Sequence, residues 1–246
     1  MTTVDHSLSE RNMPTRIRQK GFPIGNVRFD LIVALLASWF VIGLYLDGWA
    51  HNHGRVDETF FTPYHAVLYS GYAAVGAFLI IAHFRNVNRG YAWLRALPKG
   101  YMLSLVGVVI FGIAGAADML WHEAFGFEED LEQLLSPSHL ALASGAFLFL
   151  TGPVRATWRR SRASGWGDLL PVLLALSIIM SLLTFFIQYA SPFDNATNLI
   201  GFRPGRAWIV DHVGITSAMM YTGILIATLL FTMRRFRLPF GAVTFM

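Results

Sequence analysis

Two segments of the chain carry the same combination of one carboxylate and two imidazoles, and each segment joins one apolar stretch to the next. In both, an aspartate precedes the first histidine by four residues, which places the two side chains on one face of a helix, about one turn apart. The second histidine comes two residues after a proline in both segments. The two sets are Asp47, His51 and His65, and Asp118, His122 and His139.

Each set can hold a transition metal if its three side chains converge. Two imidazoles and one carboxylate that leave coordination positions open can bind copper, iron or zinc, and ligand type alone does not choose among these metals. The competing explanation is that such residues cap helices and form hydrogen bonds at a membrane interface. Because the set occurs twice, and because charged groups at the ends of apolar spans are costly, we favour metal binding.

Four residues near these sets are candidates for lesser roles. His53 could be a fourth ligand of the first site, although a role in the loop is the better interpretation. Glu58, Glu128 and Glu129 could accept hydrogen bonds from the ring N–H groups of ligating histidines, an arrangement that orients the rings. Solvated acidic loops explain these glutamates equally well.

A third and incomplete copy of the pattern lies closer to the C-terminus. It keeps an aspartate and a histidine at Asp211 and His212, but the upstream segment 185–189 reads Phe-Phe-Ile-Gln-Tyr and lacks the Asp-His spacing. A structural pair at the start of a helix is the preferred interpretation, and a weaker third metal site is the alternative.

The composition predicts helices that cross a membrane. The chain is 54% hydrophobic and only 14% charged, with a mean hydropathy of +0.49, outside the usual range for soluble domains. Six apolar runs are long enough to span a bilayer. They cover 28–49, 63–84, 101–121, 138–158, 168–190 and 207–233. We therefore predict an all-α integral membrane protein with six transmembrane helices in three hairpins, each hairpin joining an odd helix to the following even one.

The rest of the chain is predicted to form two tails. Residues 1–27 are polar and basic with no apolar core of a signal peptide, so we expect a cytoplasmic N-terminal tail, a membrane domain over 28–233 and a cytoplasmic C-terminal tail over 234–246. The chain has no cysteine, which excludes disulfides, thiolate metal sites and cysteine nucleophiles.

The basic residues predict the orientation. Sixteen of the nineteen lysines and arginines lie in the two tails and in the second and fourth connections, and only Arg55, Arg203 and Arg206 lie at the other ends of the spans. The positive-inside rule then places both termini in the cytoplasm of a prokaryotic cell and the Asp-His sets on the extracytoplasmic side of its inner membrane. A basic face beside a bilayer is typical of contact with anionic lipid, and no nucleic-acid module is present.

The two sets resemble those of a known family. The segment from Asp47 to His51, followed by Phe-Thr-Pro-Tyr-His ending at His65, resembles the copper-ligand segment of the C subunit of particulate methane and ammonia monooxygenases. The segment with His122 and His139 is similar to the second ligand cluster of that subunit, where an Asn usually stands in place of Asp118. The interval between the two histidines is one residue longer in the first segment, and about three longer in the second, than in that family.

The resemblance implies a function. The first set would hold copper at the outer face, and the second would hold another copper ion or replace the first during turnover. It implies O2-dependent oxidation of a small apolar molecule, with electrons from a quinol or a partner protein. It also implies other membrane subunits and a trimer, because the monooxygenases of this family work with A and B subunits.

Other functions remain open. A non-catalytic module that handles copper or zinc would use the same ligands but leave no coordination position of the metal open. A structural membrane subunit would use the polar residues at the outer ends of its spans to pack against a partner. A transporter is disfavoured because the spans carry almost no ionisable group near their middle. A retinal protein is disfavoured because Lys20 and Lys99 lie outside the spans.

Overall fold

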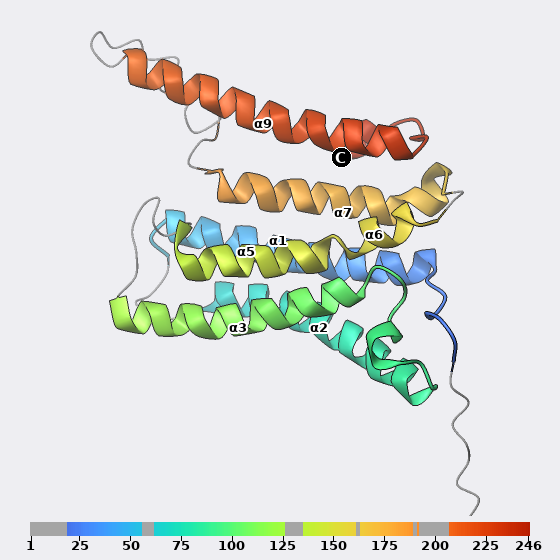
Figure 1. Ribbon diagram of the computed structural model, residues 1–246. Coiled ribbons are helices and arrows are strands. Elements are labelled where there is room, and N and C mark those ends of the chain that lie inside the picture. The colour runs from blue at the N-terminus through green and yellow to red at the C-terminus, as the bar shows by residue number, and fades with distance from the viewer. Residues whose placement is uncertain (1–18, 56–61, 126–134, 161–162, 189–190, 192–206) are drawn as a thin grey trace, which may run out of the picture.

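The computed structural model describes residues 19–55, 62–125, 135–160, 163–188, 191 and 207–246, with the side chains of Phe125 and of residues 207–213 left out. The described residues form helices and connecting turns (Figure 1). The helices are α1 (Val27–Asn52), α2 (Pro63–Asn88), the short 3-10 helix η1 (Trp93–Arg95), α3 (Met102–Phe125), α5 (Pro137–Leu150), α6 (Gly152–Trp158), α7 (Gly165–Phe186), α9 (Ala207–Arg235) and α10 (Ala242–Phe245).

Six helical segments are long and apolar enough to cross a membrane, with α5 and α6 counted together as one segment. They coincide with the six runs predicted from the sequence, so the all-α class and the number of spans are confirmed for the described part of the chain. The ends differ by a few residues, most of all in α7, which begins and ends earlier than the predicted 168–190.

The spans pack side by side in layers (Figure 1). α1 packs against α2 and α7, and α3 packs against α5, while α9 lies on the outer side of α7. α7 is the most buried span. In an apolar stretch of 18 residues of each span, 56% is buried in α7 but only 6% in α9. The core therefore lies between α1, α2, α3, α5 and α7, and α9 is peripheral.

α1 and α2 approach closely because two glycines face the backbone of the opposite helix. A Cβ atom on Gly43 would lie 2.6 Å from Leu68 Cα, and one on Gly71 would lie 2.6 Å from Phe40 Cα, which is closer than real Cβ atoms come. Small residues of this kind permit close helix packing within a membrane. This contact brings Asp47, one turn beyond Gly43, beside the first turns of α2.

The N-termini of α2 and α5 are built alike. Thr62 and Ser136 have extended backbones, and their hydroxyl oxygens accept hydrogen bonds from the backbone N–H of His65 at 3.1 Å and of His139 at 3.3 Å. A proline follows each cap at the first helical position, where its missing N–H leaves no hydrogen bond unmade. Each cap places a histidine in the first turn of its helix.

The fourth span is interrupted at Thr151, where the sequence predicts one continuous helix. Pro153 cannot donate the hydrogen bond that would continue the helix, and its ring crowds the preceding turn. The guanidinium of Arg155 contacts the hydroxyl of Thr151 and donates to the carbonyl oxygens of Leu148 and Gly100, each at 2.8 Å. Arg155 thus supplies hydrogen bonds to carbonyl groups next to the break.

A buried ionic contact lies at the end of the bundle where α1 begins. Asp30 is fully buried on α1, its carboxylate lies 2.6 Å from Arg160 Nη2, and it accepts a hydrogen bond of 2.6 Å from the hydroxyl of Tyr101. Burial, and then the charge of Asp30, raise the pKa of Tyr101 well above its usual value, so the phenol stays protonated and donates. The contact ties α1 to the segments that precede α3 and follow α6.

Candidate metal centres

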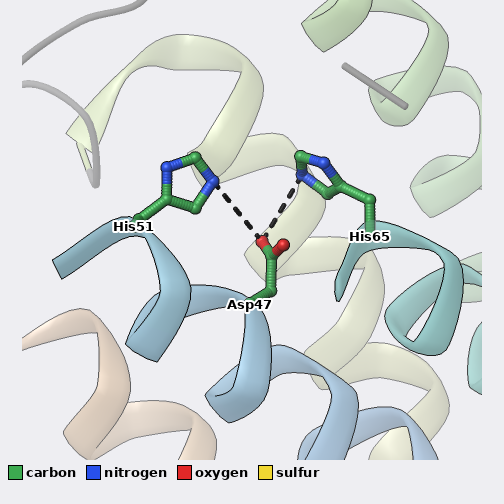
Figure 2. A group of neighbouring side chains, drawn as sticks. All are labelled: Asp47, His51 and His65. Carbon is green, nitrogen blue, oxygen red and sulfur yellow. Dashed lines mark ion pairs between the residues drawn. The ribbon is translucent and has the colours of Figure 1, made fainter. Parts of the chain in front are cut away.

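The first Asp-His set converges between α1 and α2 (Figure 2). Asp47 Oδ2 lies 3.8 Å from Nε2 of His51, one turn along α1, and 3.4 Å from Nε2 of His65 in the first turn of α2. The three side chains are 11%, 20% and 16% exposed in the order Asp47, His51 and His65. The two imidazole rings therefore lie on either side of one mostly buried carboxylate.

The second set converges in the same way between α3 and α5. Asp118 Oδ2 lies 3.7 Å from Nε2 of His122, and Asp118 Oδ1 lies 3.7 Å from Nδ1 of His139. The centres of the two imidazole rings are 5.8 Å apart, against 5.9 Å in the first set. Two pairs of helices thus repeat one arrangement, as the spacing in the sequence predicts.

The distances fit a shared cation better than direct hydrogen bonds. Hydrogen bonds between nitrogen and oxygen are about 2.7–3.2 Å long, and the four carboxylate–imidazole distances are longer, from 3.4 to 3.8 Å. Ligand atoms bound to one ion at about 2.1 Å in tetrahedral geometry lie about 3.4 Å from one another. In each set the three ligand atoms all lie within 4.8 Å of one another, so small side-chain movements suffice to enclose an ion.

Each of the two carboxylates also has one buried oxygen atom that lacks a hydrogen bond in the described part of the chain. Asp47 Oδ1 and Asp118 Oδ1 are buried and make no hydrogen bond within the described structure. A buried charged oxygen without a hydrogen bond is costly, and a bound cation would offset that cost directly. The donor set and these two oxygen atoms therefore fit a divalent or monovalent transition-metal ion.

The helix caps also contact the second histidine of each set. In the first set, the hydroxyl of Thr62 lies 3.4 Å from Nδ1 of His65, which leaves Nε2 facing Asp47. In the second, the hydroxyl of Ser136 lies 2.8 Å from Nδ1 of His139, the same atom that faces Asp118. The first set therefore needs no change of ring orientation to turn Nε2 of His65 toward Asp47, whereas His139 must release Ser136 or turn its ring.

Both sets line one cavity of about 100 Å³ in the core of the bundle. The remaining walls are mostly apolar and come from all five core helices, with Phe40, Leu68, Phe111, Leu142 and Leu182 among them. Asn52 and Gln188 line the cavity as well, and the amide of Asn52 donates a hydrogen bond of 3.4 Å to Gln188. The two sets are thus parts of one compartment, which the sequence alone did not reveal.

Tyr69 is a cavity residue that the sequence analysis missed. Its ring centre lies 6.1 Å from that of His65, one turn earlier on α2, and its hydroxyl lies against α3 at Gly115, where a Cβ atom would come within 3.0 Å. The signal in the sequence was the spacing of four residues from His65, the same spacing that joins Asp47 to His51.

The other candidate residues are not brought into either set. His53 stacks on Trp49 with ring centres 4.7 Å apart, and its Nδ1 lies 2.8 Å from the carbonyl oxygen of Trp49, so it takes no part in the first set. The remaining candidates lie outside the described residues or, in α9, have side chains that the structure does not describe: Glu58, Glu128, Glu129, Asp211 and His212.

The fold and the site together define a class: a helical protein with the features of a multi-pass membrane protein and with two Asp-His-His groups that could hold metal ions. Comparison of the chain with protein-family models, with curated proteins and with solved structures finds no match.

Proposed function

We propose that this protein is a copper-binding membrane subunit, similar to the C subunit of copper membrane monooxygenases, that oxidises a small apolar substrate with O2. The observation that carries the proposal is the convergence of two Asp-His-His groups on one mostly apolar cavity. Copper bound there would supply the redox chemistry, with electrons from a quinol or a partner protein.

The side chains of the chain itself have separable roles in this proposal. Asp47 and Asp118 supply negative charge that favours a cation in apolar surroundings, and the four histidines supply nitrogen ligands. The hydroxyl of Thr62 lies on the Nδ1 side of the His65 ring, away from Asp47. The apolar walls exclude water, which strengthens electrostatic interactions inside the cavity and protects reactive species.

Copper is the metal proposed because of the resemblance of the ligand segments, and the ligand types also suit iron or zinc. We further propose that the protein lies in the inner membrane of a prokaryotic cell, with both termini cytoplasmic and the cavity toward the extracytoplasmic side, and, by the resemblance, that it forms a trimer with other membrane subunits. The distribution of basic residues supports this orientation.

Non-catalytic metal handling is the second candidate function. It would use the same six ligands, and the mobility that His139 needs to leave Ser136 is compatible with metal transfer. The apolar cavity favours catalysis, because a site that only stores an ion has no use for a compartment able to admit an apolar molecule. A purely structural subunit is the weakest candidate, since it leaves the two buried carboxylate oxygens unexplained.

The first test is the metal content of protein purified from its native membrane. We expect about two copper ions per chain, and about one in each of the double variants His51→Ala/His65→Ala and His122→Ala/His139→Ala, because each removes two of three ligands from one site. His53→Ala is the matched control, since it removes an outer-face histidine that stacks on Trp49 instead.

The outcomes separate the candidate functions. Copper that falls in both double variants but not in His53→Ala, together with oxygen uptake that requires copper and a reductant, supports the proposal. Metal without oxygen uptake would favour metal handling. If the wild-type protein and all the variants hold no metal, the structural subunit is the remaining function.

A further inference from the structure

A second hollow lies directly beside the metal cavity. It is a groove of about 750 Å³ between α5 and α7, and it shares three lining residues with the cavity: Ala143, Leu182 and Phe186. The same three side chains therefore form a wall between the two spaces. Both helices belong to segments able to span a membrane, and the groove runs along α5 and the last turns of α7, at the end of the bundle that carries the Asp-His sets.

The groove is apolar and opens outward. Leu140, Phe147 and Leu183 line it and are 46%, 42% and 38% exposed, as expected for side chains that face lipid. Ser144 is the polar side chain in its described lining, and its hydroxyl donates a hydrogen bond of 2.8 Å to Leu140 within the helix. The groove thus offers no free polar group to a charged or hydrated molecule, which would lose its hydration there without compensation.

The internal repeat places a small side chain in this wall at Ala143. Ala143 follows His139 by four residues on α5, just as Tyr69 follows His65 by four residues on α2. On α2 this position carries a large ring that fills the space up to α3 at Gly115. On α5 it carries only a methyl group, and Ala143 lines both the cavity and the groove.

We propose that the seam between α5 and α7 is the route by which a small, uncharged, apolar molecule dissolved in the bilayer enters the metal cavity, with Ala143 at its narrowest point. The use of such a molecule as a substrate rests on the proposed function, but the route itself does not require a metal. The competing route is the polar side of the cavity near Asn52 and Gln188, which would admit molecules from water.

A single engineered thiol tests the route without any metal. The chain has no cysteine, so Leu68→Cys provides one reactive group on the α2 wall of the cavity, at a position that is 7% exposed. The protein is reconstituted in lipid nanodiscs with a chelator. The rate of modification is then measured for methyl methanethiosulfonate, which is uncharged, and for its trimethylammonium-ethyl analogue, which is charged.

We expect the uncharged reagent to modify Leu68→Cys and the charged one to react far more slowly. Adding Ala143→Phe should slow the uncharged reagent by about tenfold or more, because a ring in place of a methyl group thickens a close-packed wall where the proposed route is narrowest. Leu182→Trp narrows the same wall from α7 and should act similarly. The matched control is Ala218→Phe, the same enlargement at an exposed position on α9 away from both hollows, and it should leave the rate unchanged.

Three results would overturn the route: no reaction with the uncharged reagent, equal rates for both reagents, or rates that neither Ala143→Phe nor Leu182→Trp lowers. Misfolding cannot imitate the expected result, because an unfolded variant exposes its thiol and reacts faster. Metal content is measured separately, so loss of the copper proposal and loss of the route are distinguishable.

Discussion

Asp47 and Asp118 each place a carboxylate in apolar surroundings with one oxygen that makes no hydrogen bond. Such a group lowers stability unless a cation or donor reaches it. The neighbouring imidazoles lie too far from the carboxylates for strong hydrogen bonds, at 3.4 Å or more. At the residue scale, the proposed metal binding accounts for the two aspartates, whereas the stability of the fold does not require them.

This interpretation predicts opposite effects on stability and on metal binding. Asp47→Asn should raise the stability of the metal-free protein by about 1 kcal/mol, because it removes a poorly compensated buried charge. The same change should weaken metal binding by at least about tenfold, because it removes a charged ligand. Thermal unfolding with a chelator and metal titration measure the two effects, and Asp118→Asn provides the matched change in the second set.

A carboxylate that only supports the fold would give a different pattern. Asp47→Asn would then lower the stability of the metal-free protein and leave metal binding unchanged. Asp168, which lies in the first turn of α7 and accepts a hydrogen bond from the backbone N–H of Ser164 at 3.2 Å, is a reference for that behaviour.

At the scale of elements, helix pairs position the ligands. The turn of a helix sets the distance from Asp47 to His51, but the contact with His65 exists only because α1 and α2 approach closely at Gly43 and Gly71. The caps at Thr62 and Ser136 start the returning helices so that a histidine falls in the first turn. Helix spacing is thus as important for the site as the ligands.

A methyl group at the contact between α1 and α2 should disturb both the fold and the first site. Gly43→Ala places a Cβ atom 2.6 Å from the backbone of α2 and should lower stability by about 1–3 kcal/mol, because the helices must move apart. Metal binding at the first set should weaken, while the second set on α3 and α5 keeps its metal.

Gly223→Ala is the matched control, because in the described part of the chain a Cβ at that position of α9 would meet no atom within 4 Å beyond its own stretch of helix. It should be neutral or gain up to about 1 kcal/mol from the higher helix propensity of alanine. Equal effects of the two substitutions, measured by thermal unfolding and metal titration, would show that the contact at Gly43 does not hold α1 beside α2.

At the scale of the whole molecule, metal binding should stabilise the bundle. The two sets join α1 to α2 and α3 to α5, and α7 closes the cavity between these pairs. An ion bound only by the folded protein adds about 2.7 kcal/mol of stability at a free concentration one hundred times its dissociation constant. Chelation should therefore lower the apparent unfolding temperature of the wild-type protein.

The variant without the four ligand histidines is the control for this effect. The change His51→Ala/His65→Ala/His122→Ala/His139→Ala should abolish the dependence of the unfolding temperature on metal and chelator. A dependence that persists in this variant would place the stabilising metal elsewhere in the chain.

Some features follow from local sequence and others do not. Apolar runs of sufficient length predicted all six spans, because the cost of burying polar backbone and charge in lipid acts on each segment separately. His83 shows the limit of this approach: it lies two residues before Arg85 near the end of α2, yet it is 1% exposed and lies edge-on against Trp93 of η1. Its burial depends on how the chain after α2 folds back, which the segment itself does not encode.

The sequence by itself determined the class of the protein, the spans, the helix caps and the four-residue spacing of each Asp-His pair, because hydropathy and helical geometry are local. Only the tertiary structure decided that both sets open into one cavity, that Asp30 pairs with Arg160, and that Ala143 lines both the cavity and the groove. These features depend on which faces of distant helices meet, and side-chain packing across the whole bundle decides that.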